Sequence, residues 1–330
     1  MTLSSLRMFA LLTASFVLAA CDDPAAAGAH ERSYGSKSKG GECPPWECGY
    51  NTAEVNGRTI RELNLDGVAN SDGVRILGFA APAGLLGNYK LAVEGDELVA
   101  RDGAKTLRGA ALIGATIVVD TVGLLKLPTT ITIAGYTEQQ AWAEGAAKVP
   151  SYTLVYPDAG ALLGVRDVCN SDPLGPLTSS AVVLGGETYD LESKTVNPGQ
   201  DRWLTIACAG SAAAKLRLMN YGPQSDFDGE GHPATPAQRQ ATLKMLTADY
   251  CGGGESYTAN GTPLAWENAA GTVQTSTKLG ALEAVWSASG ALCLEATRLA
   301  DAAVDCELPS CESLGEDPLA QGEWITHLPE

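Results

Sequence analysis

Short runs of alternating apolar and polar residues recur through the first half of the chain. They are rich in β-branched side chains and are separated by pairs such as Asn56-Gly57 and Asp102-Gly103, which favour tight turns. Many short strands at spacings of about ten residues are typical of an antiparallel sandwich or barrel. The pattern therefore predicts a β-rich domain over residues 43–160, with strands at 58–63, 74–80, 89–93, 97–101, 116–120, 129–136 and 151–156.

The second half of the chain, residues 161–300, mixes strand and helix patterns. Apolar runs predict three strands, and two hairpins are expected to turn at Asn260-Gly261 and at Ser289-Gly290. Residues 301–330 are expected to form an acidic tail of loops that contains two cysteines. The three predicted strands lie at 182–184, 203–209 and 215–219.

The signals for a helix are concentrated after residue 234. Thr235 is a suitable N-cap, Pro236 suits the first helical position, and Gln238 completes a capping box. Gly252 suits a left-handed residue at the end of the helix. Apolar side chains recur on one face at Leu243, Leu246 and Tyr250. The chain is thus predicted to be mainly β with one clear helix at about 236–250, in a disulfide-stabilised antiparallel sandwich or barrel-like fold.

The first 20 residues have the pattern of a secretory signal peptide. A short segment with one cation, Arg7, precedes an apolar run over residues 8–20. This run is too short for a membrane-spanning helix, which needs roughly 20 residues. It ends in LAAC at 18–21, the pattern of a bacterial lipobox. We therefore expect residues 1–20 to be removed and Cys21 to carry the lipid.

A lipid on Cys21 would attach the protein to a membrane, because two or three acyl chains hold a protein stably on a bilayer. Residues 21–42 contain few large apolar side chains, so we expect a flexible lipidated tether. Asp22 and Asp23 resemble a sorting signal for the inner membrane, but that rule varies among bacteria. The expected location is extracytoplasmic and membrane-anchored, and the anchor could lie in the inner or the outer membrane.

Eight cysteines remain besides Cys21. An even number in an exported chain favours up to four disulfides, because the compartments outside the cytoplasm are oxidising. Two close pairs share one spacing, and each pair could close a local ring or join the other pair across the folded region; we favour local rings. The other four are spaced for long-range disulfides between strands. The close pairs are Cys43 with Cys48 and Cys306 with Cys311, and the other four are Cys169, Cys208, Cys251 and Cys293.

Charge and spacing argue against several kinds of ligand. The formal net charge is −17 at pH 7, and so acidic a surface repels nucleic acid and anionic lipid headgroups. The sequence has no C-x2-C pair and three histidines, which argues against a zinc site. It also lacks the common motifs of nucleotide-binding proteins, serine hydrolases and zinc proteases. We therefore expect neither a cofactor nor a nucleic-acid partner.

Several motifs in the second half resemble the ADYC domain family, which takes its name from the tetrapeptide found here at 248–251. They occur in order and at suitable spacings over about residues 160–300. The segment from 46 to 156 resembles the region that commonly precedes this domain. The motifs are TIACAG at 205–210, Lys215, YGP at 221–223, Ala248, Asp249, Tyr250, Cys251 and Gly252, NGT at 260–262, LEAVW at 282–286, GALC at 290–293 and Arg298.

The resemblance implies a bacterial envelope protein, often with a lipobox, but no established activity. Many members have a cysteine after the lysine that matches Lys215 and another shortly before the ADYC motif. This chain has Leu216 and Thr242 at about those places, so the disulfide that the resemblance implies for other members is missing. Tyr257 stands where many members have histidine, which weakens a catalytic cysteine–histidine pair at the motif.

Cys251 could be a disulfide partner, a catalytic nucleophile or a free buried thiol. A nucleophile needs a lowered thiol pKa, which a helix N-terminus or a nearby cation supplies. Cys251 instead follows the C-terminus of the predicted helix, whose dipole disfavours a thiolate, and it lies near Asp249 and Glu255. We therefore expect a structural disulfide at Cys251 and assign no catalytic residue.

The acidic loop at 226–231 matches the start of a calcium-binding loop. Asp226, Asp228 and Glu230 would be its first ligands, but the twelfth position is Ala237 instead of the carboxylate that closes such a site. We therefore favour a solvated loop and expect no metal, with calcium at this loop as the weaker alternative.

Six tryptophans raise the possibility of a binding platform for a glycan or a peptide. Tryptophan also fills the cores of β-proteins, and for any one of the six this use is the more common. The six are Trp46, Trp142, Trp203, Trp266, Trp286 and Trp324.

These features predict a lipid-anchored protein of the cell envelope that binds or scaffolds an envelope or extracellular ligand of unknown identity without catalysis. Its other partner is the membrane, through the lipid on Cys21. The alternative is an envelope hydrolase or a thiol-dependent enzyme that uses Cys251 with Asp249 or His232. A free, reactive Cys251 would favour the enzyme, and a concave face lined with exposed tryptophans would favour the binding protein.

Overall fold

A computed structural model of the chain describes residues 52–121, 128–170, 172, 177, 179–259, 261–275, 280–300 and 302–328. All of these residues belong to one unit, Tyr34–Glu330. The predicted signal peptide, Cys21, the tether, and Cys43 and Cys48 lie outside the described residues. Within the described part, no helix is long and apolar enough to cross a membrane.

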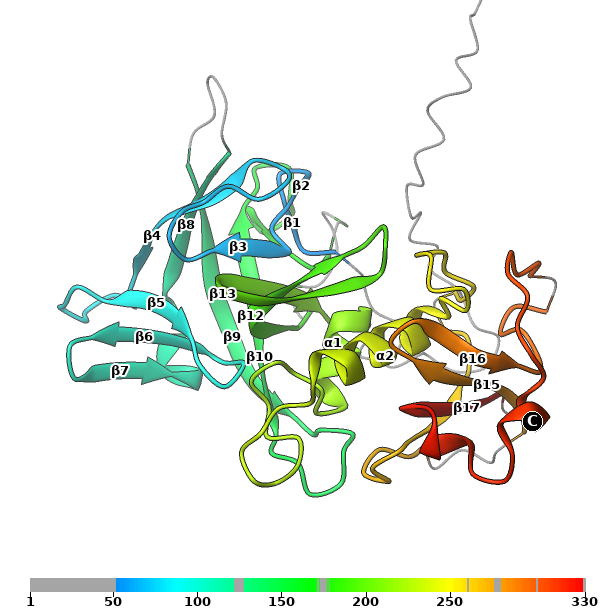
Figure 1. The fold of residues 1–330 in the computed structure, drawn as a ribbon. Helices are drawn as coiled ribbons and strands as arrows, with labels where there is room; N and C mark the ends of the chain where they lie inside the picture. Colours follow the sequence, from blue (N-terminus) through cyan, green and yellow to red (C-terminus); the bar gives the residue numbers. More distant parts are fainter. Residues whose placement is uncertain are drawn as a thin grey trace, which may run out of the picture. The chain divides into compact units, whose positions relative to one another are not determined.

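The largest element of the fold is an antiparallel sheet of eight strands (Figure 1). The strands are β3 (Glu62–Asn64), β4 (Val74–Ala80), β8 (Thr116–Thr121), β9 (Thr129–Gln139), β10 (Val149–Pro157), β11 (Val165–Asp167), β12 (Ala181–Asp190) and β13 (Thr195–Cys208). Their order is β3-β13-β12-β10-β9-β8-β4, and β11 pairs with β10 beside this path. The sheet takes strands from both sides of residue 160, so the division expected there does not separate two sheets.

Two smaller sheets come from the first half of the chain. One is a hairpin and the other has three strands. Asn56-Gly57 forms the turn of the hairpin with both residues at positive φ, and Asp102-Gly103 lies at a turn of the three-stranded sheet. Both predicted turns are therefore confirmed. The strands are β1 (Glu54–Val55) and β2 (Arg58–Thr59) in the hairpin, and β5 (Lys90–Val93), β6 (Leu98–Asp102) and β7 (Lys105–Arg108) in the other sheet.

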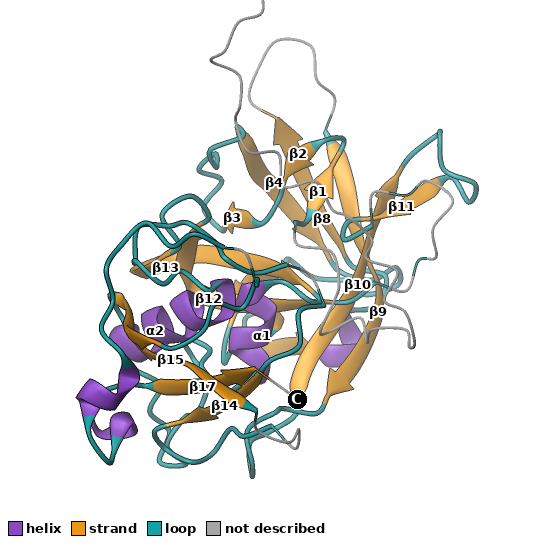
Figure 2. Ribbon diagram, turned by 90° about the vertical axis from the view of Figure 1, so that its right-hand side faces the viewer, coloured by secondary structure: helices purple, strands orange, loops and turns teal. Residues whose placement is uncertain are grey.

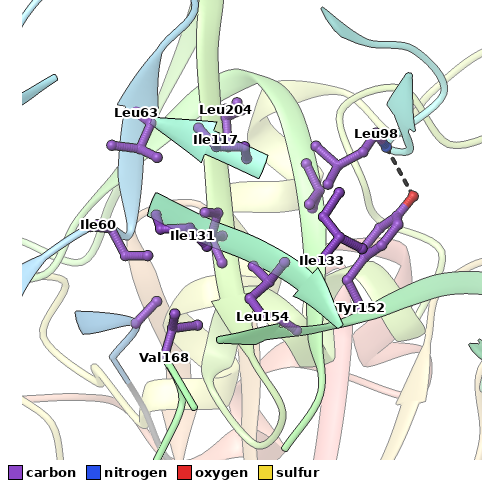
Figure 3. Packing of buried hydrophobic residues seen from close by; sticks show 14 of the residues in the cluster. Ile60, Leu63, Leu98, Ile117, Ile131, Ile133, Tyr152, Leu154, Val168 and Leu204 are labelled. Atoms are coloured by element: carbon purple, nitrogen blue, oxygen red, sulfur yellow. Dashed lines mark hydrogen bonds between the residues drawn. The ribbon is translucent and has the colours of Figure 1, made fainter. Parts of the chain in front are cut away.

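The first hydrophobic core joins the eight-stranded sheet to the three-stranded sheet (Figure 3). Ile117 on β8 and Ile131 and Ile133 on β9 are fully buried in it. The Tyr152 hydroxyl on β10 accepts a hydrogen bond from the backbone N–H of Leu98 on β6 at 3.0 Å. This bond satisfies the one polar atom of the buried tyrosine side chain and fixes β6 against β10.

The described residues contain two α-helices, α1 (Ala212–Leu218) and α2 (Pro236–Thr247). The start of α2 is as predicted, because Thr235 and Gln238 form the capping box. Its last residue lies three positions before the predicted end. The strand predicted at 215–219 is wrong, since this segment belongs to α1. The Ser211 side chain caps α1 by accepting from the N–H of Ala214, and the alanine-rich start favours a helix over a strand.

The four-stranded sheet of the second half includes a strand that the sequence pattern did not predict. Its strands are β14 (Ala265–Asn268), β15 (Ala281–Ser287), β16 (Gly290–Leu294) and β17 (Trp324–Leu328), in the order β14-β17-β15-β16. The segment 301–330 is therefore not a loop throughout, because β17 lies inside this sheet. The same segment holds the short 3-10 helices η2 (Cys311–Leu314) and η3 (Pro318–Ala320), and η1 (Gly109–Leu112) precedes β8.

One of the two predicted hairpins is confirmed. β15 and β16 form a hairpin in which Ser287 pairs with Gly290. The hairpin predicted to turn at Asn260-Gly261 is wrong, because residues 256–259 form no strand and β14 pairs with β17. The chain does turn at this place, because the N–H of Thr262 donates to the carbonyl of Ala259 at 3.1 Å. The flanking segments do not pair with each other, and β14 instead pairs with a strand far along the chain.

The second hydrophobic core surrounds the two helices between the large sheet and the four-stranded sheet (Figure 2). Trp286 and Trp324 are its largest fully buried side chains. Their indole N–H groups donate to the hydroxyls of Thr326 and Thr242, both at 2.8 Å. These two tryptophans therefore fill a core, which is the more common use expected of them.

The chain is mainly β and antiparallel, as predicted. The fold is sandwich-like. The large sheet does not close into a barrel, because β3 and β4 are the two ends of its strand order. The second helix, α1, is the main addition to the predicted architecture.

Candidate functional site

The motif at 248–252 directly follows α2. Ala248 ends the helix in the left-handed region, at φ 50°. The backbone N–H of Asp249 then donates to the carbonyl of Lys244 at 3.0 Å, which satisfies one of the last carbonyls of the helix. Ala248 thus occupies the left-handed position that the sequence assigned to Gly252. The turn directs the rest of the motif toward the core.

Asp249 forms a buried ion pair with Lys244. Its Oδ2 atom lies 2.6 Å from the lysine Nζ and accepts from the N–H of Gly254 at 2.9 Å. The lysine also donates to the carbonyls of Ser193 and Gly252, at 2.9 and 3.0 Å. Both charged side chains are at most 4% exposed. The pair therefore ties the last turn of α2 to the motif and to the loop before β13.

Tyr250 belongs to a second buried network. Its hydroxyl donates to Glu283 Oε1 at 2.6 Å and accepts from the backbone N–H of Arg298 at 2.8 Å. The Arg298 guanidinium in turn forms two hydrogen bonds to the Glu283 carboxylate, at 3.0 and 3.2 Å. The tyrosine ring stacks on Trp286 with ring centroids 5.2 Å apart. Burial raises the pKa of Tyr250, and the neighbouring Glu283 adds to the shift, so the phenol stays neutral.

Six of the eight predicted cysteine partners form three disulfides. Two disulfides fasten the segment after residue 300 to the ADYC motif and to β16, and the third joins the end of β13 to the loop after β11. The local ring predicted between Cys306 and Cys311 is wrong, because each pairs with a distant cysteine. The three disulfides are Cys169–Cys208, Cys251–Cys306 and Cys293–Cys311.

Gly252 and Gly253, which follow the motif cysteine, differ in whether the structure has room for a side chain at that position. Gly252 has φ +72°, and a Cβ atom there would overlap the carbonyl oxygen of Ser289. The next residue, Gly253, has open space where its Cβ would be. Close approach of two backbones, at the tip of the β15–β16 hairpin, therefore explains the first of these glycines.

We expect Gly252→Ala to lower the free energy of unfolding by about 2–3 kcal/mol, because it combines an unfavourable φ with overlap against backbone. Urea denaturation followed by circular dichroism measures the change. Gly253→Ala is the matched control and should leave the transition almost unchanged. Equal losses in the two variants would contradict the close approach described above.

Two further buried ion pairs connect α2 to β12 and α1 to the turn between β5 and β6. The Nε atom of Arg239 on α2 donates to Oε2 of Glu187 on β12 at 2.7 Å. Arg217 on α1 lies 3.8 Å from Asp96, which also accepts from the N–H of Gly185 at 3.0 Å. Burial raises the pKa of both carboxyl groups, and the arginines oppose the shift. These pairs hold the helices on the sheets.

The acidic loop at 226–231 is ordered by its own hydrogen bonds. Asp228 accepts from the N–H of Glu230 at 2.8 Å and lies 2.7 Å from Nδ1 of His232. The first of these contacts does most to lower the pKa of Asp228, to about 2. Asp228, Glu230 and His232 are exposed and within reach of one another. Asp226 accepts from the N–H of Gly231 instead, so the loop only partly gathers the three predicted calcium ligands.

A cavity of about 290 Å³ lies between the loop at 140–145, after β9, and the loop at 271–274, after β14. The N–H of Glu144 donates to the carbonyl of Thr272 at 2.8 Å and joins the two loops. Trp142 lines the cavity, and its ring stacks on Trp266 with centroids 5.8 Å apart and planes 23° from parallel. A second cavity, of about 230 Å³, lies on the large sheet and is lined by Glu62, Thr188, Asn197, Gln200 and Trp203.

Sequence reasoning missed Lys244 as the partner of Asp249, and it included Glu283 and Arg298 in the family motifs without giving either a role. All three are charged residues that the structure buries, which is uncommon. A sequence pattern alone does not separate them from exposed charges such as those of the acidic loop. Of the residues in the predicted enzyme alternative, Cys251 is in a disulfide and Asp249 is bound to Lys244. His232 is exposed and contacts Asp228.

The sequence model of the ADYC domain matches residues 109–300, so the match begins about 50 residues earlier than the motifs alone suggested. It takes in η1 and β8–β10 in addition to the segment that carries the motifs. No curated protein matches the chain, and no solved structure matches it. The ADYC model covers more than half of the chain, and the chain therefore belongs to the ADYC domain family.

Proposed function

We propose that this protein is exported, is anchored by a lipid on Cys21 to the bacterial cell envelope, and binds a ligand there without catalysis. The lipobox pattern and the signal-peptide pattern support the anchor. The three disulfides support export, because such bonds persist mainly in oxidising compartments.

The Cys251–Cys306 disulfide is the observation that carries the proposal of binding over thiol chemistry. A nucleophilic thiolate at Cys251 would require this bond to be reduced. Asp249, the other motif residue with reactive chemistry, is committed to the ion pair with Lys244 and to the N–H of Gly254. The motif therefore works as a structural junction between α2, the β15–β16 hairpin and the segment after residue 300, and the ligand is bound elsewhere.

Mapping the state of the cysteines tests the proposal. The full chain is expressed in a bacterium, recovered from the envelope fraction, alkylated without reduction and analysed by mass spectrometry. We expect a diacylglyceryl group on Cys21, and alkylation of Cys251 only after a reductant is added. A Cys21→Ser variant should leave the membrane fraction and keep its disulfides.

Two results would contradict the proposal. An unmodified Cys21 within an intact N-terminal segment would remove the lipid anchor. Rapid alkylation of Cys251 near neutral pH without reductant would instead favour the thiol-dependent enzyme.

A further inference from the structure

The geometry of the cavity between the loops 140–145 and 271–274 points to a binding site for a neutral saccharide, as one or two pyranose units of a longer chain. This inference deepens the binding function proposed above and rests on it, because an envelope location would place the protein among polysaccharides. The cavity lies outside the ADYC tetrapeptide and uses none of its residues.

The tryptophan at the cavity is the first argument. Trp142 is partly exposed and lines the cavity, and its ring is backed by Trp266 in a stacked pair. Backing by a second indole fixes the plane of the first. Where this fixed ring is exposed in the cavity, it can contact the C–H groups of a pyranose ring at little entropic cost, as large aromatic side chains do in other binding sites.

The polar rim is the second argument. Gln140, Glu144, Thr272 and Gln274 bring two amides, a carboxylate and a hydroxyl to the lining of the cavity beside Trp142. Such groups donate to and accept from neighbouring sugar hydroxyls at the same time. The lining residues include no lysine, arginine or histidine, and the whole chain carries a net charge of −17. An anionic sugar would be repelled, so the saccharide is neutral.

The rigidity of the second loop is the third argument. The Asn268 side chain is fully buried. Its Oδ1 atom accepts hydrogen bonds from the N–H groups of Thr272 and Val273, both at 2.9 Å. Its Nδ2 atom donates to the Thr272 hydroxyl and to the Tyr221 hydroxyl, both at 3.0 Å. With the bond from Glu144 to Thr272, these contacts hold the second loop against the first before a ligand arrives. A preformed site loses less binding energy to ordering.

The size of the cavity sets the length of the ligand. Its volume of about 290 Å³ lies at the lower end of the range of roughly 300–1,000 Å³ that is usual for small-molecule sites. It therefore holds one or two sugar rings, and the remainder of a chain would extend into solvent. Binding should be weak, with a dissociation constant on the order of 0.1–1 mM for a short oligosaccharide.

Isothermal titration calorimetry with the lipidated chain in detergent tests the site. The probes are cellopentaose and penta-N-acetylchitopentaose, which are neutral, and an oligogalacturonate of the same length, which is anionic. We expect at least one neutral probe to bind and the anionic probe not to bind. Trp142→Ala should weaken binding about tenfold or more, and Gln140→Ala with Gln274→Ala should weaken it severalfold.

The controls separate binding from folding. Gln140 and Gln274 are exposed, so their variants test the site even if Trp142→Ala unfolds. Trp203→Ala, in the cavity on the large sheet, is the matched control and should bind as the unmodified chain does. Loss of binding in Trp203→Ala with retention in the Gln140 and Gln274 variants would overturn the site, and equal binding of the anionic probe would overturn its assignment to neutral sugars.

The calorimetry tests the saccharide site, and the cysteine mapping tests the lipid anchor, so the two proposals can fail separately. A chain lipidated on Cys21 that binds neither neutral probe would overturn the saccharide site and leave the anchor standing. A chain that binds cellopentaose or penta-N-acetylchitopentaose through Trp142 but carries no lipid would support the site and contradict the proposed anchor.

Discussion

Asp249→Ala is expected to lower the free energy of unfolding by about 3–5 kcal/mol. The substitution leaves the Lys244 ammonium, which is 4% exposed, without its carboxylate partner. Breaking one side of a buried ion pair costs this much because the remaining charge is desolvated and uncompensated. The N–H of Gly254 also loses its acceptor. Urea denaturation followed by circular dichroism would measure the change.

Two further variants identify the cause of that loss. Lys244→Met combined with Asp249→Leu removes both charges and should recover a large part of the stability, because well-packed apolar residues often replace a buried pair at little cost. Glu138→Ala breaks the exposed pair with Lys148, whose side chains are 51% and 61% exposed, and should have little effect. A loss at Asp249 no larger than that at Glu138 would show that the buried pair contributes little to the fold.

Removing the Cys251–Cys306 disulfide by substituting both cysteines with alanine is expected to cost about 4 kcal/mol. Removing Cys293–Cys311 in the same way should cost about 3 kcal/mol. The two bonds close segments of different length, since the cysteines are 55 and 18 residues apart. A longer closed loop removes more entropy from the unfolded chain. The same urea experiment, without reductant, ranks the two double variants.

Reduction of the unmodified chain is the control for this ranking, because it should destabilise by more than either double variant. If the Cys293–Cys311 variant were the less stable of the two, loop entropy would not be the main contribution. The cost would then come from packing around β16 and η2, where both of its cysteines are buried.

Local signals in the sequence predicted the elements that depend on neighbouring residues. The capping box at Thr235 and Gln238 marks the start of α2, and Asn56-Gly57 marks the first hairpin, because each acts within a few residues. The segment at 215–219 was misassigned because a short apolar run suits a helix or a strand, and the capping serine that decides between them lies outside it.

The parts that the sequence could not predict depend on distant partners. β17 is a five-residue strand whose neighbours, β14 and β15, lie about 40 or more residues away, so nothing near it in the sequence indicates its pairing. The spacing of Cys306 and Cys311 suggested a local ring. In the structure, Cys306 instead forms a disulfide with Cys251, and Cys311 forms one with Cys293. The partners of the ADYC motif and the stacked Trp142–Trp266 pair are brought together in the same way, by tertiary structure.

The position of β17 constrains the order in which the protein can assemble. Under the export proposed above, the chain would cross a membrane with its N-terminus leading and would present β14, β15 and β16 first. These strands then lack the one that joins β14 to β15, and Trp324 is not yet available to the second core. The sheet closes only when residues 324–328 arrive, after both cysteines of the preceding segment have reached the oxidising side. Oxidation at Cys306 and Cys311 can therefore hold the late segment near its place before the final strand is inserted.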